Sequence, residues 1–311
     1  MTVKPSRRTS RAPFLLTARR TAERLRAERS ASTVANYLTA LRSMESFLTD
    51  QAMADAPLSR RLVADYDQWL AARGVSANTR SCYLRSLRAL YNAAGSRRRQ
   101  DDTFSAVFTG NASTCKRAVS LKAVRRIRSL RNYATGRLRL AADVFMFSLY
   151  AMGMPFADAA SLRWSDISSG RIEYRRSKTG VRVSVRLEPC MREILGRWRG
   201  TNGGYVFPLV PHDTPCGEWA RAYAAALGRY NRDLGRIGKR VGMGVRLSSY
   251  AARHTWATLA HGGGMRLADI AEAMGHRSTQ ATVVYIKNGG NKRIESANRR
   301  LIAAINGDEI S

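Results

Sequence analysis

Residues 247–258 read Leu-Ser-Ser-Tyr-Ala-Ala-Arg-His-Thr-Trp-Ala-Thr, and residues 274–285 read Met-Gly-His-Arg-Ser-Thr-Gln-Ala-Thr-Val-Val-Tyr. They contain an arginine (Arg253), a histidine (His276) and a tyrosine (Tyr285), three residue types that act on phosphates. Arginine binds phosphate oxygens through two parallel hydrogen bonds and stays charged at physiological pH. Histidine exchanges a proton near neutral pH, and tyrosine can form a covalent intermediate. The pattern therefore predicts a site that binds and acts on a phosphate group.

The spacing of apolar residues makes most of this region helical. Small and apolar residues recur at helical spacing after two serines at 248–249, a residue type that caps helices. Three glycines at 262–264 end that helix. A second short helix ends at Gly275, which puts His276 in a turn. A third helix is expected to carry Tyr285.

The boxes Arg-His-Thr-Trp-Ala-Thr, Met-Gly-His and Thr-Val-Val-Tyr resemble the signature of the tyrosine recombinases, the phage integrase family. They occur in the family's order, and His276 precedes Tyr285 by nine residues, as the family pattern has it. The resemblance implies that Tyr285 is the nucleophile and that Arg253 and His276 stabilise charge on the phosphate. The alternative is a helical core in which the three are unrelated surface residues. For any one of these residues alone, that alternative is the simpler interpretation. For the three boxes in order, the family resemblance is the better interpretation.

The boxes look closest to those of Bacteroides-type mobile-element integrases, with Gly-Met-Pro-Phe, Lys-Thr-Gly and Tyr-Xaa-Ala-Arg-His. Two positions depart from the general family pattern. Pro155 stands where the family's first catalytic arginine is expected, and Tyr250 stands where its first histidine is expected. Tyr250 is therefore a candidate site residue in the histidine's place. For the arginine, the hypothesis is that another arginine fills the gap in space, and the sequence does not identify it.

Strand alternation marks residues 171–176 and 181–187, and a Ser-Lys-Thr-Gly turn at 177–180 joins them. Lys178 therefore lies at the tip of a hairpin. A lone lysine in a turn is usually solvated. The resemblance implies a catalytic role for Lys178, because the family carries a catalytic lysine on this hairpin. That lysine protonates the leaving 5′-oxygen.

The charge balance indicates a polyanionic partner. The 311 residues include 53 Lys plus Arg and 23 Asp plus Glu, for a net charge of +30. Such a surplus favours nucleic acid as the partner. The family resemblance implies that this nucleic acid is double-stranded DNA. Apolar residues make up 44 % of the chain, enough for a sizeable core. No cofactor or metal is expected, because a phosphotyrosine keeps the bond energy and cationic side chains take the metal's role.

The cysteines and the lengths of the apolar runs indicate in which cellular compartment the protein is expected. The four cysteines lie far apart, without metal-ligand or redox spacing, and are interpreted as reduced, buried thiols. No run of eighteen apolar residues and no apolar signal core occurs, so no membrane span is expected. These features favour a cytoplasmic, nucleoid-associated bacterial protein.

The length suggests two domains. A basic segment at 1–29 precedes a helical domain at 30–95, a basic linker at 96–118 and a second domain at 119–311. The first domain resembles a SAM-like core-binding domain, and the second resembles the α+β catalytic domain of tyrosine recombinases. The expected fold is mainly α with a small β-hairpin or sheet. The candidate DNA contacts in the first domain and linker are Arg42, Arg80, Arg85, Arg88, Arg97, Arg98 and Arg99. For any single arginine, a solvated helix face is the simpler interpretation.

Apolar residues recur at helical spacing over about 292–306, after a glycine-containing link at 286–291. This apolar stripe must be buried, either on its own domain or on a neighbouring subunit, as in the family. We expect the neighbour, because recombination joins two duplexes and uses four active sites. The expected assembly is a homotetramer on paired DNA sites, and the resemblance allows accessory DNA-bending proteins as further partners.

Three other functions are compatible with parts of the pattern. A type IB topoisomerase shares the chemistry but relaxes one duplex without pairing sites. A non-catalytic DNA-binding protein of the same fold would form no covalent adduct. An RNA-binding module is the weakest of the three, because no aromatic motif for stacking bases is present.

Overall fold

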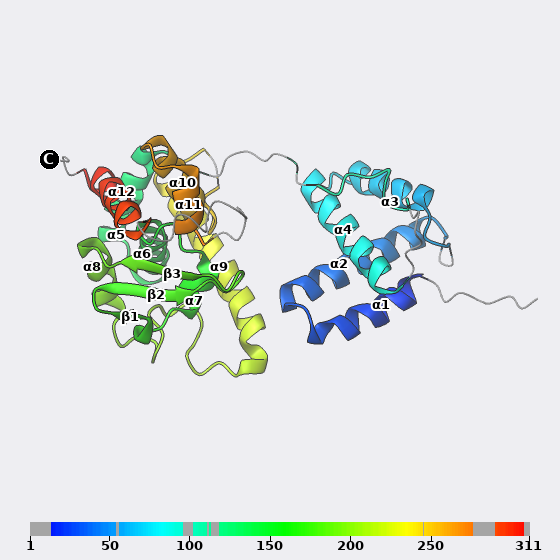
Figure 1. The fold of residues 1–311 in the computed structure, drawn as a ribbon, viewed down its shortest axis with the longest axis horizontal. Coiled ribbons are helices and arrows are strands. Elements are labelled where there is room, and N and C mark those ends of the chain that lie inside the picture. The colour runs from blue at the N-terminus through cyan, green and yellow to red at the C-terminus, as the bar shows by residue number, and fades with distance from the viewer. Residues whose placement is uncertain are drawn as a thin grey trace, which may run out of the picture. The chain divides into compact units, whose positions relative to one another are not determined.

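The computed structural model describes residues 14–53, 56–95, 102–110, 112, 118–244, 246–275 and 290–307. These residues divide into two compact units, one up to residue 112 and the other from residue 118 onward. Both units are mainly helical, and the second also holds a small antiparallel sheet (Figure 1). This is the fold class expected from the sequence.

The first unit is a helical domain with one apolar core. The Ser30, Ser59 and Ser76 hydroxyls each accept a hydrogen bond from a backbone N–H three residues on, which begins three of its helices. Leu41, Met44, Tyr66, Leu84 and Leu87 are fully or nearly fully buried between the helices. The helices are α1 (Phe14–Arg24), with the short turn η1 (Leu25–Ala27), α2 (Ala31–Asp50), α3 (Arg60–Ala72) and α4 (Ala77–Ala93).

This domain is larger than the predicted 30–95 at both ends. Ala18 and Ala22 of α1 are fully buried in its core, because α1 packs against α2 and α4. Beyond α4, Phe104 is 8 % exposed and packs edge-on against Tyr91. Residues 14–29 and 102–110 therefore belong to the domain, not to a basic tail and a linker. Each segment packs on residues far away in the sequence, and its own pattern does not reveal these partners.

The second unit is built around helix α6 (Gly136–Tyr150). Its residues 141–150 are all buried, as expected for a helix covered on every side. The helices that pack most closely against it are α5 (Leu121–Tyr133), α7 (Phe156–Ser161), α8 (Pro189–Trp198), α9 (Trp219–Arg240) and α10 (Ala251–Gly262). Helix α6 is therefore the centre of this domain.

Three strands form the sheet of the described residues, in the order β1 (Ile167–Ser168), β2 (Arg171–Arg175) and β3 (Arg182–Arg186). All pairs are antiparallel, and Tyr174 of β2 lies opposite Val183 of β3. The predicted hairpin is confirmed, with slightly shorter strands. The short turns η2 (Trp164–Asp166) and η3 (Cys216–Glu218) precede β1 and α9.

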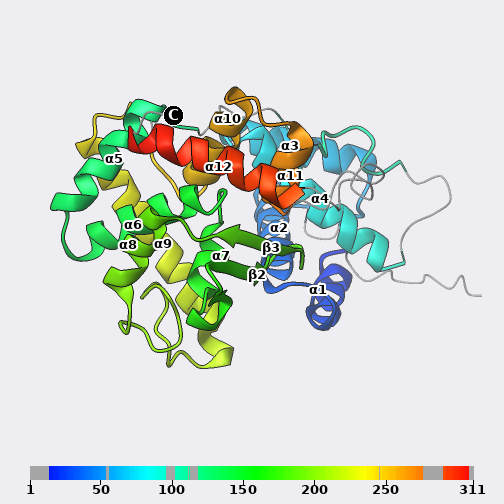
Figure 2. The ribbon, with the colours of Figure 1, turned by 60° about the vertical axis from the view of Figure 1, so that its left-hand side comes forward.

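The domain closes with α11 (Leu267–Ala273) and α12 (Gly290–Asn306). Helix α12 begins two residues earlier than expected and lies against α5, α10 and α11 of its own chain (Figure 2). In the structure, the apolar stripe of α12 is therefore buried on its own domain, the first of the two alternatives. Exchange with a neighbouring subunit stays a prediction.

Two expectations about compartment can be compared with the structure. Cys216 is exposed and Cys82 and Cys190 are half-buried, so the prediction of buried thiols is wrong for Cys216. Within the described ranges, no helix combines the length and apolar character that a bilayer span requires.

Candidate active site

Arg253 occupies the first turn of α10 and is 7 % exposed. The helix begins after Tyr250, and no side chain caps it, so the prediction of a serine cap is wrong. Instead the Ser248 carbonyl accepts a hydrogen bond from the Ala251 N–H, and the Ser249 N–H donates to Asn231 Oδ1 at 2.8 Å. Residues 248 and 249 thus fix the approach to the helix through their backbone.

Two carbonyl groups hold the Arg253 guanidinium. Nη1 donates to the Gly153 carbonyl at 2.9 Å, and Nη2 donates to the Met274 carbonyl at 2.7 Å. Gly153 has φ +74°, and a Cβ there would lie 3.1 Å from Arg253 Cα. Glycine is therefore required for α10 to approach the turn that contains Pro155. The Gly-Met-Pro-Phe box at 153–156 and the box that contains Arg253 meet at this contact.

Arg176 is a candidate site residue that the sequence pattern did not reveal. It follows β2, is 7 % exposed and donates from Nη1 to the Met274 carbonyl at 3.2 Å. Arg253 donates to the same oxygen, so the two guanidinium groups lie side by side. The strand pattern holds a signal for it. Arg176 shares the strand face of Ile172 and Tyr174, and a charged residue on that inward face marks a special role.

Asp158 of α7 positions Arg176. Its Oδ2 lies 3.1 Å from Arg176 Nε, in an ion pair whose members are both nearly fully buried. Its Oδ1 accepts hydrogen bonds from the Ser177 N–H at 2.8 Å and the Ser177 hydroxyl at 2.6 Å. One carboxylate therefore clamps the start of the hairpin turn and aligns the arginine.

The local charge favours an anion. Burial, and after it the neighbouring Arg176 guanidinium, lowers the pKa of Arg253 to about 10, which leaves the group charged at neutral pH. Two adjacent guanidinium groups repel each other, and a phosphate between them would offset that repulsion through charge-assisted hydrogen bonds. The arrangement can thus bind a phosphodiester and stabilise charge that develops on it.

The segment that leads to His276 also reaches this place. Gly275 has φ +63°, and a Cβ there would lie 2.8 Å from Arg176 Cγ. The Thr179 hydroxyl donates to the Gly275 carbonyl at 3.2 Å. Gly275, the last described residue before position 276, therefore lies directly beside the hairpin turn. His276 and Tyr285 themselves lie outside the described residues.

Lys178 lies at the hairpin tip, as predicted, and Tyr250 lies at the surface close to Arg253. Lys178 is exposed at the hairpin tip, between Ser177 and Thr179, which are both anchored. Tyr250 is 53 % exposed and lies three residues before Arg253. It shares the wall of a cavity of about 80 Å³ with Pro155 and Arg253. The position of the missing arginine and the position of the missing histidine thus border one small cavity.

Tyr174 is a second tyrosine close to the arginine pair. It precedes Arg176 by two residues, and burial, followed by the Asp158 carboxylate, raises its pKa. A phenol that is buried and resists ionisation is a poor nucleophile. Its surroundings fit packing, and Tyr285 stays the candidate nucleophile.

The candidate DNA contacts of the first unit differ in exposure. Arg42 and Arg88 are exposed, whereas Arg80 and Arg85 are half-buried. Arg80 pairs with Asp67 at 3.2 Å, so its charge is offset within the domain. Arg88 donates to the Thr109 hydroxyl at 3.1 Å. The basic linker residues 97–99 lie outside the described residues.

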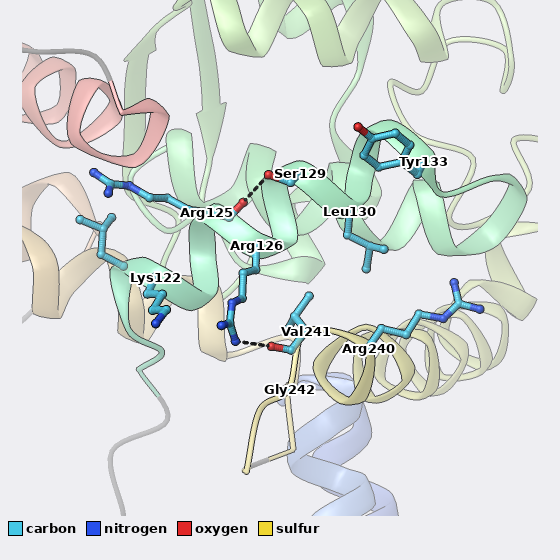
Figure 3. A pocket seen from close by; sticks show the side chains of 10 residues that line it. Lys122, Arg125, Arg126, Ser129, Leu130, Tyr133, Arg240, Val241 and Gly242 are labelled. Carbon is cyan, nitrogen blue, oxygen red and sulfur yellow. Dashed lines mark hydrogen bonds between the residues drawn. The ribbon is translucent and has the colours of Figure 1, made fainter.

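A larger groove of about 1020 Å³ lies elsewhere on the second unit, between α5 and the end of α9 (Figure 3). Lys122, Arg125, Arg126 and Arg240 line it, and Arg126 Nη1 donates to the Val241 carbonyl at 3.1 Å. Of the candidate catalytic residues that the structure describes, none lines this groove. It is a basic surface, separate from the arginine pair.

Two family models match this fold and site. Residues 119–291 match the phage integrase family, and residues 13–104 match the phage integrase SAM-like domain. The first match covers more than half of the 311 residues. The chain belongs to the phage integrase family, the tyrosine recombinases.

Solved structures share the architecture. A XerH site-specific recombinase bound to a palindromic difH substrate gives a TM-score of 0.65 at 14 % identity, covering 91 % of this chain and 94 % of the other. The Tn1549 transposon integrase with transposon right-end DNA gives 0.63 at 14 %, covering 94 % and 100 %. A lambda integrase tetramer on a Holliday junction gives 0.62 at 16 %, covering 89 % and 78 %. These identities show a common fold. Among curated proteins, no match is found.

Proposed function

We propose that this protein is a site-specific DNA recombinase that cleaves and rejoins strands through a 3′-phosphotyrosine. The observation that carries the proposal is the pair of buried arginines, Arg253 and Arg176, on one carbonyl of the segment leading to His276. The ordered family boxes supply the nucleophile, Tyr285. The biological outcome is integration, excision or inversion of a mobile element, of the Bacteroides type that the boxes resemble.

The reaction is a phosphoryl transfer with a covalent intermediate. The Tyr285 oxygen attacks the scissile phosphorus, the bond from phosphorus to the 5′-oxygen breaks, and Lys178 protonates that oxygen. Arg253, Arg176 and His276 stabilise charge on the non-bridging oxygens. The 5′-hydroxyl of a second duplex then attacks the phosphotyrosine and releases Tyr285. The number of phosphodiester bonds is conserved, so no nucleotide is consumed.

Arg176 takes the role of the arginine that Pro155 replaces. It is buried, aligned by Asp158 and adjacent to Arg253. Its position two residues before Lys178 places the second phosphate-binding arginine and the general acid on one hairpin. Tyr250, in the histidine's position, offers a phenolic hydroxyl as a further hydrogen-bond donor to the phosphate.

The proposed partner is double-stranded DNA, and the proposed working assembly is a homotetramer on paired sites. The net charge of +30 supports the first, and the lambda integrase tetramer on a Holliday junction supports the second by analogy of fold. Accessory DNA-bending proteins, a cytoplasmic location and association with the nucleoid belong to the same proposal.

Pro155 favours one other candidate function, a non-catalytic DNA-binding protein of this fold. Such a protein would bind DNA and form no adduct. A type IB topoisomerase would form the adduct and relax supercoils without pairing two sites. Both differ from a recombinase in measurable products.

Trapping on a suicide substrate tests the proposal. A DNA site nicked near the scissile phosphate loses its 5′-hydroxyl fragment by diffusion, so the covalent complex accumulates and survives denaturing electrophoresis. The wild-type protein should form this complex, whereas Tyr285→Phe should bind the same DNA and form none. The absence of an adduct in the wild type favours the non-catalytic candidate. An adduct that persists in Tyr285→Phe removes Tyr285 from its role.

A further inference from the structure

Asn298 of α12 places a polar amide in the core of the second unit. It is 2 % exposed, and its amide makes hydrogen bonds in two directions. Oδ1 accepts from the Trp256 indole N–H at 2.9 Å, and Nδ2 donates to the Tyr150 carbonyl at 3.0 Å. Burying an amide is unfavourable unless its hydrogen bonds are made. Asn298 therefore joins Trp256 and Tyr150 specifically.

Tyr150 is the last residue of α6, where backbone carbonyls lack partners within the helix. Asn298 provides one of those partners from another helix. The chain then turns sharply, with φ +56° at Met152 and +74° at Gly153. A positive φ at a buried methionine is strained and persists only when the surroundings hold it. The Asn298 hydrogen bond is one such constraint.

This strained turn carries the carbonyl that holds Arg253. Gly153 follows Tyr150 by three residues, and its oxygen accepts from Arg253 Nη1 at 2.9 Å. A shift of the turn would therefore move one of the two carbonyl groups that orient this guanidinium. The path from Asn298 to Arg253 through the end of α6 consists of two hydrogen bonds and four consecutive residues.

The second path runs along α10. Trp256 is fully buried and lies three residues after Arg253, on the next turn of the same helix. Its indole N–H is fixed by Asn298. The Asn298 amide thus ties α10 to the end of α6, the two segments that meet where Arg253 contacts Gly153.

Helix α12 makes a second hydrogen bond with Tyr150. Asn306 Oδ1 accepts from the Tyr150 hydroxyl at 3.1 Å, and it lies eight residues after Asn298, on the same helix face. Ile294, Ile302 and Ile305 share this buried side. The isoleucines supply apolar burial, whereas the two asparagines define where the end of α6 lies relative to α12.

We propose that Asn298 is a positioning residue for catalysis, which holds Arg253 against the scissile phosphate by cross-linking α10 to the end of α6. The proposal rests on the proposed function, since the phosphate is that of the cleavage reaction. It assigns to α12 a role in catalytic geometry within its own domain. A misplacement of about 1 Å in a phosphate-binding group can cost about 100-fold in rate.

The test compares Asn298→Leu with Ile302→Val. Asn298→Leu keeps the volume and removes both hydrogen bonds, whereas Ile302→Val removes one methyl from the same buried face. Single-turnover cleavage of the suicide substrate should fall about 10- to 100-fold in Asn298→Leu, with the Kd for DNA within about threefold of wild type. Ile302→Val should cleave within about threefold. Trp256→Phe, which leaves the bond to Tyr150 intact, should lie between them.

Hydrogen exchange of the free protein gives the second readout. Amides of residues 151–154 should exchange faster in Asn298→Leu than in Ile302→Val. Wild-type cleavage together with wild-type exchange in Asn298→Leu would overturn the proposal, as would equal rate losses in both variants. If Asn298→Leu does not fold, Asn298→Ser takes its place. If the wild type forms no covalent complex, the proposed function fails, and the exchange comparison still decides whether Asn298 holds the turn.

Discussion

At the scale of single residues, Arg253 and Arg176 lie together at a cost that their neighbours offset. Both guanidinium groups are buried, and they approach one carbonyl oxygen from two directions. The Asp158 carboxylate compensates one charge, and backbone carbonyls orient the other group. Charged groups that are oriented before the reaction stabilise a transition state without rearranging during it.

Lys178 gives a prediction at this scale. Lys178→Ala should slow cleavage by about 100- to 10,000-fold and leave the Kd for DNA nearly unchanged, because the leaving oxygen needs its proton only in the transition state. A substrate with sulfur at the 5′-bridging position has a leaving group that needs little protonation. Cleavage of that substrate should return to the wild-type rate. If it stays slow in Lys178→Ala, another residue is the acid.

Arg253, Lys178 and Tyr250 could be proposed as site residues from the sequence because each stands inside a recognisable box. Arg176 escaped because its role depends on a contact between residues 98 apart, Arg176 and Met274. No local pattern encodes that contact. The inward face that it shares with Ile172 and Tyr174 was the only local signal.

At the scale of elements, the hairpin is held from two sides. Asp158 of α7 binds the backbone and side chain at its first turn residue, Ser177. From the other side, Gly275 at the end of α11 packs against Arg176 and accepts from Thr179. The exposed Lys178 therefore extends from a fixed base.

Asp158→Asn tests this clamp. The variant removes the charge that compensates buried Arg176, which should cost about 3 kcal/mol of stability. For a domain of this size the melting temperature should fall by about 6–12 °C. Glu173→Gln is the matched control, because Glu173 pairs with Arg182 on the same hairpin and both side chains are exposed. Its melting temperature should stay nearly unchanged. Equal shifts in the two variants, measured by circular dichroism, would contradict the clamp.

Helices and strands followed from periodicity, whereas their extents and partners did not. The helix that carries Arg253 and the hairpin at 171–186 were both evident from apolar spacing. Helix α1 was not assigned to the first domain, because its buried side consists mainly of small residues such as Ala18 and Ala22. Periodicity also left two places for α12. In the structure α12 lies on its own domain, where Asn298 and Asn306 make polar contacts with Trp256 and Tyr150, and exchange with a neighbouring subunit stays a prediction.

At the scale of the whole molecule, the net charge of +30 sets the expected mode of DNA binding. Each phosphate contact releases counterions, with a slope of roughly −0.9 in log K against log salt. Six to ten contacts would lower the affinity by about 10³ to 10⁵ between 50 and 200 mM salt. Fluorescence anisotropy of a labelled duplex measures this slope. A flat response would mean that the charge does not face DNA.

The central claim is that the chain cleaves DNA with Arg176 in place of the arginine missing at Pro155. The rate of covalent complex formation on a suicide substrate tests it in Arg176→Ala, with Arg175→Ala as the control. Arg175 is the exposed neighbour on the same strand end and donates to the Gly180 carbonyl at 3.3 Å. Arg176→Ala should form the complex about 100- to 1,000-fold more slowly than wild type, and Arg175→Ala within about threefold of it. Complex formation by Arg176→Ala at the rate of Arg175→Ala, with equal folding and DNA affinity, would contradict the account.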